Sequence, residues 1–159
     1  MIEKIIIYRK DYKEKSILKI IFNKFVLLAA MLPMVSTLRI LLYSFVGMKI
    51  GKHVFIASYV LFDDQYPEFI SIGDNVTISY RTTVLTHDDS SGIIAPVKIE
   101  DNAWIGACVT ILPGIVIGGG SVIGAGTTIS KDVPANTKIV SAEVRIISTK
   151  KVEKSLLLY

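Results

Sequence analysis

The chain has 159 residues, 51% of them hydrophobic, and carries 18 basic against 14 acidic side chains, which gives a formal net charge of +4. This length suits one domain with an appendage. The single cysteine, Cys108, excludes an internal disulfide and cannot by itself form a zinc cluster, and no basic motif with interleaved aromatic residues indicates nucleic-acid binding. The N-terminus shows no cleavable signal peptide, which favours a reducing, cytoplasmic setting.

Residues 1–48 are expected to form a helical N-terminal segment. Residues 1–24 mix seven basic side chains with apolar ones, and residues 25–38 carry no charge. This apolar stretch is short for a transmembrane helix. Pro33 should divide it into two helices, the second capped by Ser36 or Thr37 and ended by Gly47. Two roles are favoured equally: a cap over the end of the following domain, or docking on an anionic membrane surface. A transmembrane span over residues 25–48, with Arg39 inside it, is the less favoured alternative.

A period of six residues governs the next part of the chain, 49–147. The spacing links Ile50, Ile56 and Phe62, then Ile72, Ile78 and Val84, and finally Ile99, Ile105, Ile111, Ile117, Ile123 and Ile129. This period is neither that of a helix nor that of an alternating strand, and hexapeptide repeats are typical of a parallel β-helix. One large inward residue in six and small corner residues suit three short strands per coil. The sequence therefore predicts an all-β solenoid of about four coils, followed by a basic tail, 148–159.

Two interruptions of the repeat, 63–71 and 85–98, are the places where a site is expected, because loops can vary on a rigid solenoid. The second interruption contains His87, followed by Asp88 and Asp89. Those carboxylates could orient the imidazole and raise its basicity, which makes His87 a candidate general base. An ordinary surface histidine is the alternative. His53 falls at a predicted corner and is expected to be solvated.

Several segments resemble the hexapeptide-repeat acyltransferases: residues 96–107, 113–118, 121–126 and 131–136. The likeness is strongest to the maltose and galactoside O-acetyltransferase branch and its relatives that O-acetylate surface polysaccharides, and it covers about residues 47–147. The resemblance implies that the β-helix is left-handed. It also implies a homotrimer with active sites between subunits, and acetyl-CoA as the co-substrate, with no metal.

The same resemblance gives roles to individual residues. His87 would take the proton from an acceptor hydroxyl, and Asp64 and Asp88 would contact the acceptor. The acetyl-CoA site would contain Trp104, Gly106, Ala107, Gly124, Ala125, Ser130, Lys131 and Arg145. Lys131 would meet a phosphate of the coenzyme. An asparagine typical of the branch is replaced here by Ile56 or Ser58, which weakens the case for a simple galactoside or maltose acceptor.

The expected function is therefore acetyl-CoA-dependent O-acetylation of a sugar hydroxyl in the biosynthesis of a capsule, exopolysaccharide or lipopolysaccharide. Because the N-terminal segment is basic and apolar, the expected acceptor is a lipid-linked or nascent polysaccharide sugar at the inner face of the membrane. Two alternatives are an N-acyltransferase acting on a nucleotide-linked amino sugar and a non-catalytic trimeric scaffold. A β-helical carbonic anhydrase would need three histidine ligands, and the chain has two histidines.

Overall fold

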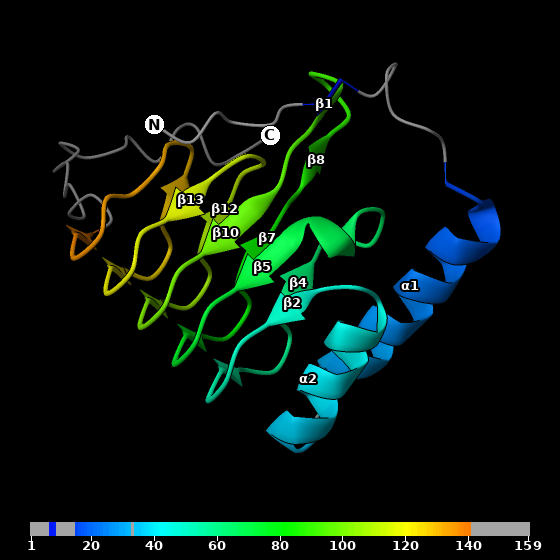
Figure 1. Ribbon diagram of the computed structural model, residues 1–159, viewed down its shortest axis with the longest axis horizontal. Helices are drawn as coiled ribbons and strands as arrows, with labels where there is room; N and C mark the ends of the chain where they lie inside the picture. Colours follow the sequence, from blue (N-terminus) through cyan, green and yellow to red (C-terminus); the bar gives the residue numbers. More distant parts are fainter. Residues whose placement is uncertain (1–6, 9–14, 33, 141–159) are drawn as a thin grey trace, which may run out of the picture.

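The computed structural model describes residues 7–8, 15–32 and 34–140, and its body is a parallel β-helix (Figure 1). Four coils each contribute one short strand to each of three sheets. The coils comprise β2 (Lys49–Ile50), β3 (Phe55–Ile56) and β4 (Leu61–Phe62); β5 (Ile70–Ile72), β6 (Thr77–Ile78) and β7 (Thr83–Val84); β10 (Val97–Ile99), β11 (Trp104–Ile105) and β12 (Thr110–Ile111); and β13 (Val116–Ile117), β14 (Val122–Ile123) and β15 (Thr128–Ile129). The predicted number of coils agrees with this arrangement.

The coils stack in register, so that each sheet is a ladder of equivalent strands. The first sheet has the order β13-β10-β5-β2, the second β16-β14-β11-β6-β3 with β16 (Lys138–Ile139) at its end, and the third β15-β12-β7-β4. The chain turns at three edges, which we call edge 1/2, edge 2/3 and edge 3/1 after the sheets that it passes between. Any two side chains one coil apart at the same edge are therefore neighbours, whatever their distance in sequence.

The isoleucines of the six-residue repeat fill the interior of the β-helix. In the uninterrupted part, from Ile99 to Ile123, each inward isoleucine is fully buried, and Ile129 in the last complete coil is 5% exposed. Burial of each such side chain contributes about 1.5–3 kcal/mol. The structure thus confirms that the period of six marks the inward positions.

Left-handed backbone recurs at the corners and explains several polar residues. At edge 1/2 the residues His53, Asn75, Asn102 and Asn136 have φ between 54° and 60°. Asparagine tolerates this region better than other residues with a side chain. His53 is exposed in this series, as expected for a corner. At edge 2/3 the same conformation falls on Tyr59, Arg81 and Cys108, with φ between 56° and 59°.

Helices α1 (Ile17–Met31) and α2 (Ser36–Phe45) cover the end of the β-helix at the first coil (Figure 1). Their inner side chains, among them Leu27, Ala30 and Tyr43, join the core of the β-helix. Gly47 has φ +102° just after α2, as predicted. The predicted cap at Ser36 or Thr37 is wrong, because Val35 precedes the helix and makes no side-chain cap. Pro33 lies outside the described residues.

Arg39 of α2 fastens the two helices to the first coil. It is 3% exposed, and its guanidinium donates to the carbonyl oxygen of Ala30 at 2.9 Å and to that of Ile56 at 2.7 Å. It also donates to the carbonyl oxygen of Leu32 at 3.1 Å. The fork shape of the guanidinium allows one side chain to reach the C-terminal end of α1 and a strand of the β-helix together. Within the described ranges no helix is both long and apolar enough to cross a bilayer.

Both interruptions of the repeat leave the β-helix at edge 3/1, one coil apart. The first, loop 63–69, contains the 3₁₀-helix η2 (Pro67–Phe69). The second, loop 85–96, forms a hairpin of β8 (His87–Asp88) and β9 (Ile93–Ile94), and β1 (Ile7–Tyr8) adds an antiparallel third strand beside β9. The stacking of coils therefore brings two loops together that are separate in sequence.

Candidate functional site

Loop 63–69 supplies a buried carboxylate to the histidine of loop 85–96. The Oδ2 atom of Asp63 accepts a hydrogen bond from Nδ1 of His87, and also from the backbone N–H groups of Thr86 at 2.9 Å and His87 at 3.1 Å. Its Oδ1 atom accepts from the backbone N–H groups of Gln65 at 2.9 Å and Tyr66 at 3.0 Å. Five donors thus hold one carboxylate, and that carboxylate fixes the imidazole.

The environment keeps Asp63 ionised. Burial of the side chain alone would raise its pKa, but the hydrogen bonds from the backbone of Tyr66 and Thr86 and from His87 hold the pKa below its ordinary value. A charged carboxylate can only accept hydrogen bonds, so Nδ1 of His87 carries the proton that is donated.

The other nitrogen of the ring is therefore the basic one. Nε2 of His87 lies 3.1 Å from the side-chain nitrogen of Gln65. An amide nitrogen can only donate, so Nε2 accepts through its lone pair, and a single tautomer satisfies both contacts. The ring of Tyr66 meets the imidazole edge to face at 5.7 Å between centroids. The half-buried ring thus carries its lone pair at Nε2, which is the arrangement that a general base requires.

Asp88 and Asp89, the carboxylates expected to orient the ring, do not hold it. Asp88 instead accepts hydrogen bonds from Ser90 and Ser91 in the tip of the hairpin, and these lower its pKa to about 2. Asp89 approaches Nε2 of His87 with an oxygen at 3.9 Å, beyond hydrogen-bond distance. Sequence proximity suggested the wrong partners, because the coil stacking supplies Asp63 from 24 residues away.

Helix α1 and Lys15, which lies just before it, contact loop 63–69. Lys15 forms an ion pair with Glu68 and donates to the carbonyl oxygen of Gln65 at 2.6 Å. Lys24 pairs with the carboxylate of Asp64 at 3.2 Å. Asp64, the predicted acceptor contact, thus follows Asp63 in the loop, but its carboxylate pairs with Lys24 of α1. Loop 63–69, which supplies Asp63 to the histidine, is thus itself held by contacts with α1 and Lys15.

The residues assigned to acetyl-CoA fall on two different edges. Gly106, Ala107, Gly124 and Ala125 lie at edge 2/3 in the third and fourth coils, next to Trp104, which is 44% exposed on the second sheet. Ser130 and Lys131 lie exposed at edge 3/1, two coils from His87. Arg145 lies outside the described residues. A single chain therefore does not bring the whole predicted set together.

Gly106 has a structural explanation of its own. A Cβ atom at this position would lie 2.6 Å from the backbone nitrogen of Ala125 in the next coil, so no side chain fits. Ala107 and Ala125 follow at the outer side of the same corner, half-buried and exposed. Their small side chains leave the backbone of edge 2/3 open to close approach.

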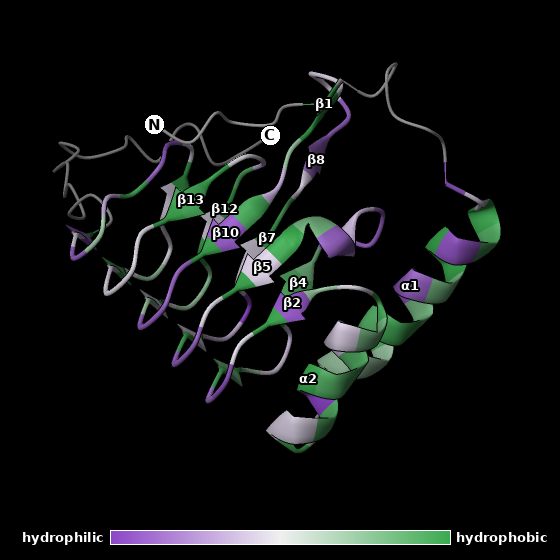
Figure 2. Cartoon of the chain, in the orientation of Figure 1, coloured by the Kyte–Doolittle hydropathy of each residue, from purple (hydrophilic) through white to green (hydrophobic). Residues whose placement is uncertain are grey.

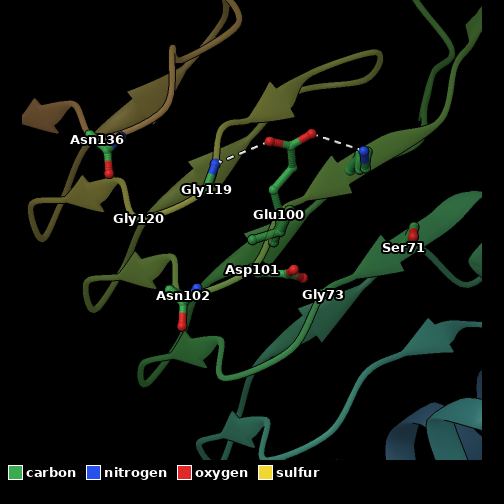
Figure 3. Close-up of a pocket in the computed structure, with 10 residues that line it drawn as sticks. Ser71, Gly73, Glu100, Asp101, Asn102, Gly119, Gly120 and Asn136 are labelled. Atoms are coloured by element: carbon green, nitrogen blue, oxygen red, sulfur yellow. Dashed lines mark hydrogen bonds and ion pairs between the residues drawn. The ribbon is translucent and has the colours of Figure 1, made fainter.

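A groove of about 610 Å³ runs along edge 1/2, away from these residues (Figure 3). Figure 3 shows the carboxylate of Glu100 beside the N–H of Gly119. This carboxylate accepts from that N–H at 3.1 Å and from the ammonium of Lys98 at 2.8 Å. The carboxylate of Glu100 is thus occupied by its own neighbours, and Asp101, the other acidic residue of the groove, accepts from the backbone N–H of Asp74 at 2.8 Å. No group of three His, Cys, Asp or Glu side chains in the described part of the chain could hold a metal ion.

Comparison with known proteins supports the resemblance seen in the repeats. A family model described as bacterial transferase hexapeptide (six repeats) matches residues 96–131. The Bacillus subtilis protein named "Putative acetyltransferase YvoF" is 39% identical over 142 residues, which cover 87% of this chain and 83% of that protein. The chain belongs to the hexapeptide-repeat acetyltransferases.

Two further relatives extend this result. The galactoside O-acetyltransferase of Escherichia coli is 34% identical over 107 residues, which cover 62% of this chain and 52% of that enzyme. The hexapeptide-repeat acetyltransferase VCA0836 of Vibrio cholerae, solved in complex with acetyl-CoA, superposes with a TM-score of 0.64 at 26% identity and covers 84% of this chain. The predicted left-handed parallel β-helix, acetyltransferase class and acetyl-CoA co-substrate are confirmed at the level of the family.

Proposed function

We propose that the protein transfers the acetyl group of acetyl-CoA to a sugar hydroxyl, with His87 as the general base. The observation that carries the proposal is the buried Asp63 carboxylate on Nδ1 of His87, which leaves the lone pair on Nε2. Such a base typically accelerates a reaction about 10²–10⁴-fold. Asp63 acts as a positioning residue, since it touches the base and not the reacting atoms.

In the proposed reaction, Nε2 of His87 removes the hydroxyl proton while the oxygen attacks the thioester carbonyl. The tetrahedral intermediate collapses with loss of the CoA sulfur, and the imidazolium returns its proton to that sulfur, so that the products are the acetyl ester and CoA-SH. A backbone N–H at a coil corner would stabilise the oxyanion. Gln65 is the side chain that the acceptor hydroxyl displaces.

The proposed acceptor is a sugar of a lipid-linked or nascent surface polysaccharide, acetylated at the inner face of the cytoplasmic membrane. The likeness to an enzyme named galactoside O-acetyltransferase supports a sugar hydroxyl. The helical N-terminal segment, residues 1–48, supports an acceptor that is attached to a membrane. Within this proposal Asp64 and Asp88 line the approach to His87 at edge 3/1.

The separation of the two edges supports a homotrimer as the active form. His87 stands at edge 3/1, whereas Ala107 and Ala125 stand at edge 2/3, with the third sheet between them. In side-by-side protomers, edge 3/1 of one chain can face edge 2/3 of its neighbour. The thioester bound along the small residues of one protomer would then meet the histidine of the next.

Calorimetric titration with acetyl-CoA tests this function. We expect micromolar binding that weakens at least tenfold in Lys131→Ala and is unchanged in the control Lys52→Ala, an exposed corner lysine at edge 1/2. His87→Ala should bind acetyl-CoA as the wild type does but release CoA about 10²–10⁴-fold more slowly with a sugar acceptor. Absence of acetyl-CoA binding would refute the enzyme and favour a scaffold.

A further inference from the structure

Many large apolar side chains are exposed on the outer face of α1 and α2. Among the described residues, eleven large apolar side chains between 17 and 45 are exposed: Ile17, Leu18, Ile21, Phe22, Phe25, Leu28, Leu32, Val35, Leu38, Leu41 and Phe45. Phe25 and Phe45 are each 72% exposed. Figure 2 shows that hydrophobic residues occupy much of both helices, with hydrophilic residues between them.

This surface, which we call the helix face, is continuous across the two helices. The rings of Phe22 in α1 and Phe45 in α2 meet at 5.9 Å between centroids. The opposite sides of the same helices are already used, since Val26, Leu27 and Tyr43 are buried against the first coil. The helices thus have one apolar side for the core and a second for a partner, and large exposed patches of this kind mark interaction sites.

The charged side chains carried by the two helices are all basic. No aspartate or glutamate occurs between residues 15 and 62, whereas Lys19 and Lys24 are exposed on α1. A second copy of the chain would bring two such faces together with lysines and no carboxylates on the helices to pair with them. An apolar surface with a cationic rim is instead complementary to a lipid layer with anionic headgroups.

We propose that the helix face docks on an anionic membrane surface. Helix α1 has 15 residues, so it is about 22 Å long and suits a position parallel to the bilayer plane. Its phenylalanines and leucines enter the boundary of the acyl chains while Lys19 and Lys24 reach the headgroups. The enzyme lies on the membrane through the end of its β-helix.

The docked helix also fixes the site relative to the lipid. The buried side of α1 also contacts loop 63–69, because Asn23 donates to the carbonyl oxygen of Asp64 at 3.4 Å, and this loop carries Asp63 and Gln65 next to His87. The helix that docks on the lipid thus also contacts the loop that positions Nε2 of His87. The purpose of docking rests on the function proposed above. A docked enzyme would meet an acceptor sugar that is presented beside the bilayer.

Sedimentation of the full-length protein with lipid vesicles tests the proposal. We expect binding to vesicles of phosphatidylcholine with phosphatidylglycerol, and weak binding to phosphatidylcholine alone or in high salt. Phe25→Ser should weaken binding by about tenfold, because a side chain that enters the apolar layer is lost. Phe55→Ser is the matched control, since Phe55 is 51% exposed on β3 and outside the helix face.

Three results would overturn the docking surface: no binding to either vesicle, equal binding to both, or equal loss in Phe25→Ser and Phe55→Ser. A lower assembly mass in Phe25→Ser by light scattering, without lipid, would assign the face to a second copy instead. Titration of the same samples with acetyl-CoA separates the two proposals. Acetyl-CoA binding without lipid binding refutes docking alone, and lipid binding without acetyl-CoA binding refutes the reaction alone.

Discussion

Replacement of Asp63 by asparagine is the sharpest test of how the site is built. The carboxylate accepts five hydrogen bonds, two at Oδ1 and three at Oδ2. Asparagine has one oxygen and one NH₂ group, so in either orientation at least two buried backbone N–H groups face a donor. At about 1–3 kcal/mol for each unsatisfied group, the free energy of unfolding should fall by about 2–6 kcal/mol.

The catalytic effect of Asp63→Asn should be separable from this loss of stability. Without a fixed acceptor at Nδ1, the ring of His87 no longer keeps its lone pair at Nε2, and kcat should fall by about 10²-fold or more. The KM for acetyl-CoA should stay the same, because Ala107 and Ala125 lie at another edge and Lys131 lies two coils from His87. Imidazole ¹⁵N chemical shifts report which ring nitrogen carries the proton, and we expect the tautomer to change.

The assay is release of the CoA thiol at a temperature where circular dichroism shows the variant folded. Asp74→Asn is the control, since Asp74 also accepts a backbone N–H, that of Lys52 at 2.7 Å, but at edge 1/2. If folded Asp63→Asn kept its kcat within about threefold, or lost it no more than Asp74→Asn does, the positioning role would be wrong.

Three further predictions concern stability. Arg39→Met should lower the free energy of unfolding by about 2 kcal/mol or more in urea titration, because carbonyl groups at the end of α1 lose their buried donor. Tyr43→Phe should raise it by about 1 kcal/mol: burial raises the pKa of Tyr43 to about 12, and its hydroxyl has no hydrogen-bond partner among the described residues. A lower midpoint in Tyr43→Phe would contradict this. The pKa of Asp63 is lowered on folding, so its ionised form stabilises the protein above about pH 4, and this contribution should disappear as the pH falls through the lowered pKa. Thermal melts between pH 6 and 2.5 should show a smaller pH effect in Asp63→Asn.

The repeat could be predicted from sequence because it depends on local spacing alone. Every sixth residue from Ile99 to Ile123 must face inward if three flat strands make a coil, and each is fully buried. The site is different, because a carboxylate and a histidine meet only through the stacking of coils. The residues between Asp63 and His87 comprise one complete coil and parts of both inserted loops, so no local pattern in the sequence predicts that the two side chains meet.

In the N-terminal helices, too, some features could be predicted from local sequence and others could not. The break between the helices and the stop at Gly47 follow from backbone chemistry and were predictable. The role of Arg39 was not, because a lone arginine in an apolar stretch looks like an interruption. Only the packed structure shows that carbonyl oxygens of α1 and of the first coil surround it. Buried polar groups of this kind depend on which backbone atoms the fold leaves without a partner.

The position of both loops at one edge has a consequence for the evolution and redesign of this enzyme. Loops 63–69 and 85–96 leave and rejoin complete coils, so the parallel ladders on either side keep their register whatever the length of the inserted chain. Exchange of these two short segments between homologues can therefore replace the histidine, its carboxylate and their surroundings together, while the small residues of edge 2/3 stay as they are. A chimera with both loops replaced together is the smallest graft that keeps a carboxylate paired with its histidine.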